Sequence, residues 1–187
     1  MAKNRAVFLD RDGTINVEQE YLYRIEHFAF IPGAPQAIKL LKDAGFFVIV
    51  VTNQSGVARG YYDEAAVHDL HRYMDAELAR IGAGVDAYYF CPHHPEQGIG
   101  DYKKECECRK PLAGMLLQAA ADFSLDLKSS FIIGDKLADM EAGLKADCRP
   151  LLVRTGYGAA ESAKLPAGIP VFDDLLAAAK AIVNEPG

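Results

Sequence analysis

AVFLDRDGT, residues 6–14, joins four apolar residues to two carboxylates, a glycine and a threonine. A short apolar run bounded by turn residues predicts a buried strand of an α/β sheet. Asp10 then lies where the strand ends, at the sheet edge where open α/β folds bind ligands. Asp10 and Asp12 should face the same side, and two carboxylates this close need a shared cation or proton. Mg²⁺ is the expected cation, because it prefers carboxylate oxygens and substrate phosphate.

An isolated Asp-x-Asp is more often a loop of solvated acids than a site. Here the context favours the site, because an apolar strand precedes the pair and Gly13-Thr14 follows it. The glycine permits a sharp turn, and the threonine adds a hydroxyl beside the carboxylates.

Length and composition predict one domain over residues 1–187, because half of the 187 residues are apolar. A net charge of −6 disfavours nucleic acid or an anionic membrane as the partner. No apolar run approaches the ~20 residues that span a bilayer. The chain leads almost directly into its first strand, so we expect no cleaved export signal, a cytoplasmic location and reduced thiols. Nothing in the sequence demands more than a monomer.

Alternating apolar runs and helical patterns predict an α/β fold: a three-layer, doubly wound, mostly parallel sheet of Rossmann type. Further strands are expected at 46–51, 87–90, 130–133, 150–153 and 170–172. Helices are expected at 35–44, 63–81, 113–123 and 173–183, and a further helix after the fourth strand is expected to end at residue 146. Residues 15–31 are expected to be a loop beside the site, and 160–168 a connecting segment.

Two further strand ends carry polar residues. The second strand runs into TNQSG, residues 52–56, whose Thr52 hydroxyl and backbone N–H groups can bind phosphoryl oxygens. Taken alone, that segment fits an ordinary polar turn better. The fourth strand runs into Gly-Asp135, where a third carboxylate can complete the Mg²⁺ site and Asp139, one helical turn later, can orient it.

Three of the four cysteines lie within the segment 91–108, together with two histidines. Such clustering indicates metal binding rather than a disulfide framework, and these soft ligands suit Zn²⁺. We expect a closed, structural zinc site with four ligands: Cys91, His93, Cys106 and Cys108. His94 is the spare imidazole, because adjacent residues seldom reach the same metal.

Arg109 and Lys110 follow the zinc loop immediately. Zinc would fix the backbone before them, and a lysine above a phosphate stabilises its charge during transfer. A pair of solvated charges is the alternative. In the loop after the first strand, Glu18, Gln19, Glu20 and Tyr21 are expected to meet the substrate, although an ordinary surface loop is equally consistent.

In this order, DxDGT, Thr52, Lys110 and GDxxxD resemble the four motifs of the haloacid dehalogenase superfamily, most of whose members are Mg²⁺-dependent phosphatases. The set FLDRDGT, TNQSG, CPHHP, CxCRKP and GDK is similar to the histidinol-phosphate phosphatase group over about residues 6–155. Within that group, NQSGVARG (53–60) favours a sugar-bisphosphate substrate, with histidinol phosphate as the alternative.

The resemblance implies that Asp10 attacks phosphorus to form an aspartyl-phosphate, while Asp12 protonates the leaving oxygen and then activates water. One of these carboxylates must be ionised while its neighbour carries a proton. Mg²⁺ would be held by the Asp10 carboxylate, the Asp12 backbone carbonyl and Asp135. Thr52 and Lys110 would hold the transferring phosphoryl group.

The implied substrate is a small phosphorylated sugar, and the extra cations suit a second phosphate. With no large cap domain, the zinc loop 91–108 and the loop 18–21 would shape specificity. The implied substrate-binding residues are Glu18, Gln19, Glu20, Tyr21, Asn53, Gln54, Ser55, Arg59, Arg109 and Lys136.

Two other classes fit less well. A phospho-acceptor signalling domain also uses acids, a threonine and a lysine around Mg²⁺, but lacks Asp-x-Asp on one strand and a zinc loop. A non-catalytic zinc-stabilised module explains the cysteines and leaves the strand-end carboxylates unexplained.

Overall fold

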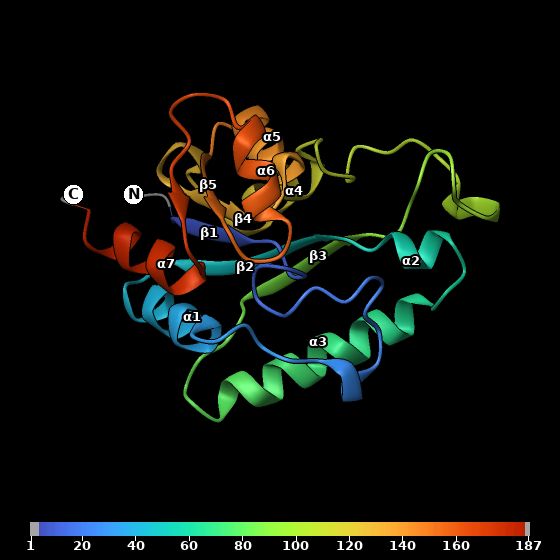
Figure 1. Ribbon diagram of the computed structural model, residues 1–187, viewed down its shortest axis with the longest axis horizontal. Helices are drawn as coiled ribbons and strands as arrows, with labels where there is room; N and C mark the ends of the chain where they lie inside the picture. The colour runs from blue at the N-terminus through green and yellow to red at the C-terminus, as the bar shows by residue number, and fades with distance from the viewer. Residues whose placement is uncertain (1–3, 186–187) are drawn as a thin grey trace.

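The computed structural model describes residues 4–185 and contains one six-stranded sheet with helices on both faces (Figure 1). The strand order is β3-β2-β1-β4-β5-β6, and every pairing is parallel. The strands are β1 (Ala6–Leu9), β2 (Phe47–Asn53), β3 (Ala87–Cys91), β4 (Phe131–Gly134), β5 (Arg149–Val153) and β6 (Val171–Phe172). The three-layer, doubly wound prediction is confirmed.

Side chains of β1 alternate between two apolar layers. Val7 and Leu9 pack with α1 (Ala34–Asp43), α3 (Glu64–Ala79) and α7 (Leu175–Val183). Ala6 and Phe8 pack on the other face with α4 (Gly114–Phe123) and α5 (Leu137–Lys145). All four strand residues are fully buried, as expected for a central parallel strand. Figure 1 shows the two helical layers above and below the sheet.

The predicted helix boundaries agree with the structure to within a few residues. Asp63 caps α3 by accepting a hydrogen bond from the Ala66 N–H at 2.9 Å. The helix ends at Ala79, two residues before the predicted end. The segment 160–168 is less irregular than predicted, because α6 (Gly158–Glu161) and a 3₁₀ turn (Ser162–Lys164) occupy most of it.

The loops at the carboxyl ends of the strands position the site. Residues 15–31 contain one 3₁₀ turn (Ile25–His27) and otherwise form the predicted loop. After β2 comes the short helix α2 (Ser55–Ala58), and after β3 the zinc loop projects beyond the sheet (Figure 1). Within residues 4–185, no helix is long and apolar enough to cross a membrane.

Candidate active site

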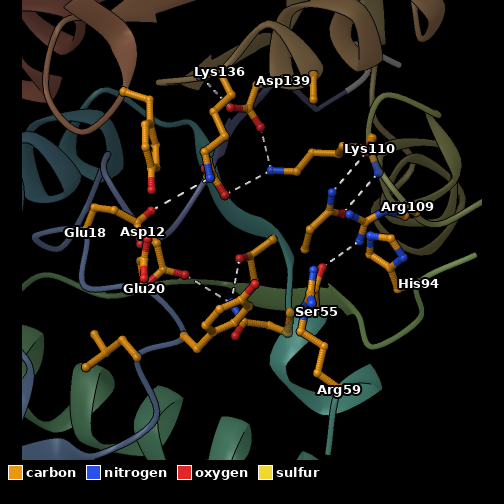
Figure 2. A pocket seen from close by; sticks show the side chains of 18 of the residues that line it. Asp12, Glu18, Glu20, Ser55, Arg59, His94, Arg109, Lys110, Lys136 and Asp139 are labelled. Atoms are coloured by element: carbon orange, nitrogen blue, oxygen red, sulfur yellow. Dashed lines mark hydrogen bonds and ion pairs between the residues drawn. The ribbon is translucent and has the colours of Figure 1, made fainter. Parts of the chain in front are cut away.

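A cavity of about 460 Å³ lies over the carboxyl ends of the strands (Figure 2). The sequence predicted most of its lining: Asp10, Asp12, Glu18, Glu20, Tyr21, Thr52, Asn53, Gln54, Ser55, Arg59, Arg109, Lys110, Lys136 and Asp139. Five lining residues were not predicted as part of it: Leu22, Tyr62, His94, Ala138 and Tyr157. Gln19 was predicted to meet the substrate but lines a separate depression with Tyr23, Arg24 and His27. Its neighbours Glu20 and Tyr21 border both hollows.

Lys110 lies at the floor of this cavity and is 4% exposed. Its Nζ donates to Asp10 Oδ1 at 2.9 Å, Asp139 Oδ1 at 2.5 Å and the Val51 carbonyl at 2.7 Å. Burial alone would lower the pKa of this ammonium, but the two carboxylates raise it above its ordinary value. The lysine is therefore a fixed cation beside Asp10.

The backbone of Lys110 is held independently of the zinc loop. The Asn53 side chain donates to the Lys110 carbonyl and accepts from the Lys110 N–H, both at 3.0 Å. Asn53 was predicted to bind substrate. In the structure its side-chain amide fixes the backbone of Lys110.

Three buried carboxylates gather next to Lys110. One oxygen each of Asp10, Asp135 and Asp139 lie within 4.8 Å of one another. Asp139 was predicted to orient the Mg²⁺ site, and in the structure it accepts at Oδ1 from Lys110 and at Oδ2 from the Lys136 N–H. Asp135 Oδ2 accepts from the Tyr157 N–H at 2.9 Å, whereas Oδ1 is buried and meets no partner among the described residues.

A buried carboxylate oxygen without a partner is costly, so Asp135 Oδ1 is suited to bind a cation. Burial, with the charges of Asp10 and Asp139, raises the pKa of Asp135 to about 8. These hard oxygen donors fit Mg²⁺ held by Asp10 and Asp135.

Asp10 and Asp12 both line the cavity, as strand periodicity predicts, but the Asp12 carboxylate is paired with Arg11 and is not part of the cluster around Asp135. It accepts hydrogen bonds from Arg11 Nη2 at 3.1 Å, Asn16 Nδ2 at 3.0 Å and Gln54 Nε2 at 3.1 Å. Burial alone would raise the pKa of Asp12, but Arg11 and these hydrogen bonds together lower it. Arg11 is the counter-ion of Asp12.

Arg11 itself is fully buried. Besides Asp12, its guanidinium donates to the Leu22 carbonyl and to Gln54 Oε1, and Nη1 lies 3.3 Å from His71 Nε2. Burial and Arg11 lower the pKa of His71 to about 3, so this ring is a neutral acceptor. His71 stacks on Tyr88 and is a satisfied core residue.

Gln54 links the acid to the threonine at the end of β2. Its Nε2 donates to Thr52 Oγ1 at 2.9 Å as well as to Asp12, and its Oε1 accepts from the Tyr62 hydroxyl at 2.8 Å. Gln54 was predicted to bind substrate, but both ends of its amide are engaged by the protein. Burial raises the pKa of Tyr62 to about 12, which keeps its hydroxyl protonated as the donor.

The zinc prediction agrees with the geometry of the loop after β3. Ligand atoms of Cys91, His93, Cys106 and Cys108 all lie within 4.8 Å of one another. The Sγ atoms of Cys91 and Cys106 are 3.5 Å apart, and Cys108 Sγ is 3.5 Å from His93 Nδ1. Two thiols this close without a disulfide fit the edges of a tetrahedral Zn²⁺ site. Hydrogen bonds from Cys91, partly offset by burial, lower the pKa of Cys108 to about 5, which favours the thiolate that zinc needs.

Cations line the cavity wall next to the zinc loop. Arg109 Nη1 donates to Ser55 Oγ at 2.8 Å and to the His93 carbonyl at 3.1 Å. The Arg59 guanidinium lies 5.5 Å from the centre of the Tyr21 ring. On the other side of the cavity, Lys136 lies 3.7 Å from Glu18 and above the Tyr157 ring (Figure 2).

Known proteins share this chain's sequence and fold. Residues 107–178 match the HAD-hydrolase-like family model. D-glycero-beta-D-manno-heptose-1,7-bisphosphate 7-phosphatases from Photorhabdus laumondii and Escherichia coli (strain K12) are 50% and 47% identical, over 81% and 83% of both chains. The chain belongs to this family of heptose bisphosphate phosphatases. The crystal structure of the B. bronchiseptica D,D-heptose 1,7-bisphosphate phosphatase, complexed with magnesium and phosphate, superposes with a TM-score of 0.88 at 38% identity, covering 97% of this chain and 99% of that one.

Membership of the heptose bisphosphate phosphatase family confirms the haloacid dehalogenase resemblance and makes the chain a phosphoric monoester hydrolase. It also supports the prediction from residues 53–60 that the substrate is a sugar bisphosphate rather than histidinol phosphate. The same family membership excludes the two other classes, a phospho-acceptor signalling domain and a non-catalytic zinc-stabilised module.

Of the residues not predicted in the cavity, Tyr62, His94 and Tyr157 carry polar groups. The signal for His94 was present in CPHHP, because a histidine excluded from the zinc site still lies beside it. Burial, with Arg109 and Arg59 nearby, lowers the pKa of His94. Tyr62 had no sequence signal, since its partner Gln54 is recognised only in the folded chain.

Proposed function

We propose that this heptose bisphosphate phosphatase removes the 7-phosphate of D-glycero-β-D-manno-heptose 1,7-bisphosphate through an aspartyl-phosphate on Asp10. The supporting observation is the Asp10 carboxylate held by Lys110 at the floor of a cavity whose far wall carries Arg59 and Arg109. The β anomer is chosen because the curated relatives are named for it. This reaction belongs to the synthesis of heptose nucleotides for lipopolysaccharide.

Asp10 Oδ attacks phosphorus, and the bond between phosphorus and the C7 oxygen breaks as the new acyl-phosphate bond forms. The departing sugar oxygen takes a proton from Asp12. Asp12 then removes a proton from water, whose oxygen attacks phosphorus and releases inorganic phosphate while Asp10 is regenerated. Lys110 stabilises the phosphoryl oxygens in both steps as a positive charge that is fixed before the substrate arrives, and Thr52 donates its hydroxyl proton, since its oxygen already accepts from Gln54.

Asp12 takes up its proton from solvent when the substrate binds. In the free site Arg11, Asn16 and Gln54 hold Asp12 as a carboxylate, which suits its role as base in the second step. A phosphate dianion beside it raises its pKa, as a like charge does, and the carboxylate is protonated as the substrate binds.

Mg²⁺ would be held by the Asp10 carboxylate, the Asp12 backbone carbonyl and Asp135, whose Oδ1 meets no partner among the described residues. When bound, the cation neutralises phosphoryl charge that would otherwise repel the attacking Asp10 carboxylate. Magnesium and phosphate in the B. bronchiseptica structure support this assignment. Lys110 and Lys136 are the cations closest to the buried acids Asp135 and Asp139 among the described residues.

Substrate specificity comes from loops rather than from a large cap domain. We assign the sugar to Glu18, Glu20 and Tyr21, and phosphate contacts to Ser55, Arg59, Arg109 and Lys136. Zn²⁺ on Cys91, His93, Cys106 and Cys108 is structural, because four protein ligands leave no open position. We further propose a single domain over residues 1–187, acting as a monomer in the cytoplasm, where free thiols persist.

Phosphate release in the presence of Mg²⁺ tests the proposal. Both anomers of D-glycero-D-manno-heptose 1,7-bisphosphate and histidinol phosphate are compared at matched concentrations. We expect the highest kcat/KM for the β anomer. Preference for the α anomer would contradict the anomer assignment alone, and preference for histidinol phosphate would overturn the substrate.

A further inference from the structure

His94 is a cavity-lining residue that neither the zinc site nor the reaction steps use. It lies in the zinc loop, half-buried, directly after the zinc ligand His93. Figure 2 shows its ring beside Arg109, with Ser55 and Arg59 on the same side of the cavity and Glu18 on the opposite side. At this end of the cavity the charged side chains are the cations Arg59 and Arg109, whereas at the other end Glu18 is paired with Lys136.

The protonation of the His94 ring follows from its hydrogen bonds. Nδ1 accepts from the backbone N–H groups of Glu96 at 3.2 Å and Gln97 at 3.0 Å. A ring nitrogen that accepts hydrogen bonds carries no proton, so the neutral ring has its N–H at Nε2. Nε2–H is then the one polar group of the ring left for a ligand.

The polar groups around His94 also offer hydrogen-bond donors. Arg59 Nε is buried and meets no hydrogen-bond partner among the described residues. Arg109 uses Nη1 for Ser55 Oγ and the His93 carbonyl, and Ser55 keeps its own hydroxyl proton to donate. Two guanidiniums, one hydroxyl and one imidazole N–H all present donors, and an anion with several acceptor oxygens satisfies such a set.

We propose that His94 is a specificity-determining residue that donates Nε2–H to the second phosphate of the substrate, between Arg59 and Arg109. The inference deepens the proposed function and rests on it, because one phosphate occupies the Asp10 end and the other must lie elsewhere in the cavity. A neutral donor suits this position, since a third cation between two guanidiniums would be repelled when the phosphate is absent.

The test compares D-glycero-β-D-manno-heptose 1,7-bisphosphate with D-glycero-D-manno-heptose 7-phosphate, which lacks the second phosphate. We measure the ratio of their kcat/KM values in wild type, His94→Phe and His94→Gln. Losing a hydrogen bond to a charged group costs about 10-fold to 100-fold in affinity. His94→Phe should therefore lower the ratio by about 10-fold or more, and His94→Gln should recover part of the loss, because its amide can donate.

His68→Phe is the matched control, because His68 is an exposed histidine on α3 outside the cavity lining. Its ratio should equal that of wild type. Zinc content is measured for every variant, and inhibition by the product heptose 1-phosphate reports binding of the second phosphate without chemistry. We expect weaker inhibition in His94→Phe than in His94→Gln at equal zinc content.

Each outcome decides between the two proposals. An unchanged ratio in His94→Phe, or equal losses for both substrates, would overturn the role of His94 while the phosphatase assignment stands. No phosphate release from the bisphosphate by the wild-type protein would overturn the proposed function itself.

Discussion

Replacing Lys110 by methionine should make the stability of the protein depend on Mg²⁺. The side chain of Lys110 is 3% exposed, and those of its partners Asp10 and Asp139 are 8% and 1% exposed. Removing one partner of a buried ion pair costs about 3–5 kcal/mol, because the remaining charge is left uncompensated. For a chain of this length, 1 kcal/mol shifts Tm by about 2–4 °C, so the Mg²⁺-free variant should melt roughly 6–20 °C lower.

Mg²⁺ supplies the missing positive charge in the Lys110→Met variant. At 100 times its dissociation constant, a ligand that binds only the native state stabilises it by about 2.7 kcal/mol. Added Mg²⁺ should therefore recover a large part of the loss in Tm. Activity should not recover, because the phosphoryl group has lost a fixed positive charge, and kcat should fall by about 10²-fold to 10³-fold.

The loss of stability should also grow with pH. The pKa values of Asp135 and Asp139 are already raised, to about 8 and about 6, by burial and by neighbouring carboxylates. A carboxyl whose pKa is raised in the folded state favours folding while it is protonated, and that contribution disappears as pH rises through its folded pKa. Without Mg²⁺, Lys110→Met should be weakened more at pH 8.5 than at pH 5.5.

Thermal unfolding followed by circular dichroism, in Mg²⁺-free buffer that retains zinc and again with Mg²⁺, measures these effects. Lys39→Met is the control, since its pair with Asp43 lies on the surface and contributes at most about 1 kcal/mol. A Lys110→Met variant as stable as wild type without Mg²⁺, or equal stabilisation of both by Mg²⁺, would refute the reasoning.

Three shorter predictions follow from the same contacts. His71→Gln should make stability depend less on pH in the acid range. The depressed pKa of His71 makes wild type lose about 2 kcal/mol of unfolding free energy between pH 7 and pH 5. Urea titrations that show equal losses in both proteins would contradict this. Zinc removal followed by restoration of Mg²⁺ should raise KM more than it lowers kcat. The substrate-binding Arg109 bonds to the His93 carbonyl in the zinc loop, whereas the catalytic Lys110 is held by Asn53. Steady-state kinetics with a larger fall in kcat would argue against it. Asp135→Asn should raise the Mg²⁺ concentration for half-maximal activity at least about 10-fold, as losing a carboxylate ligand does, and an unchanged Mg²⁺ titration would remove Asp135 from the metal site.

The parts of the site predicted from sequence are those that chain order and spacing determine. Parallel strands end at one edge of the sheet, so carboxylates after β1 and β4 must meet there, as Asp10 and Asp135 do. The zinc ligands lie close together along the chain, and their residue types restrict what they can bind. Both predictions needed only local patterns and the handedness of α/β folds.

The hydrogen-bond partners of Asp12 could not be predicted in this way. Strand periodicity predicted that its side chain faces the cavity together with Asp10, which it does. It did not predict that Arg11, Gln54 and Asn16 bind its carboxylate. Arg11 is in turn held by His71, sixty positions away in the sequence. No local pattern encodes such a contact, because it arises only when α3 packs against the loop after β1.

The same limit applies to the loop residues. Gln19 lines a neighbouring depression, and two residues later the backbone turns at Tyr21, whose φ of 60° is left-handed. The Tyr21 ring packs edge-on against Tyr61 and below Arg59, which couples the two loops at the cavity rim. A loop of mixed composition gives no sequence signal for a single residue in this conformation.

The covalent intermediate on Asp10 is the central claim, and its direct detection is the most direct test. Mg²⁺-loaded enzyme is mixed with D-glycero-β-D-manno-heptose 1,7-bisphosphate, quenched with acid within the first turnover and analysed by peptide mass spectrometry. We expect one phosphoryl group on the peptide that carries Asp10, and neither this group nor turnover in Asp10→Asn. Phosphate release by Asp10→Asn at the wild-type rate, or a phosphoryl group on another residue, would contradict the account.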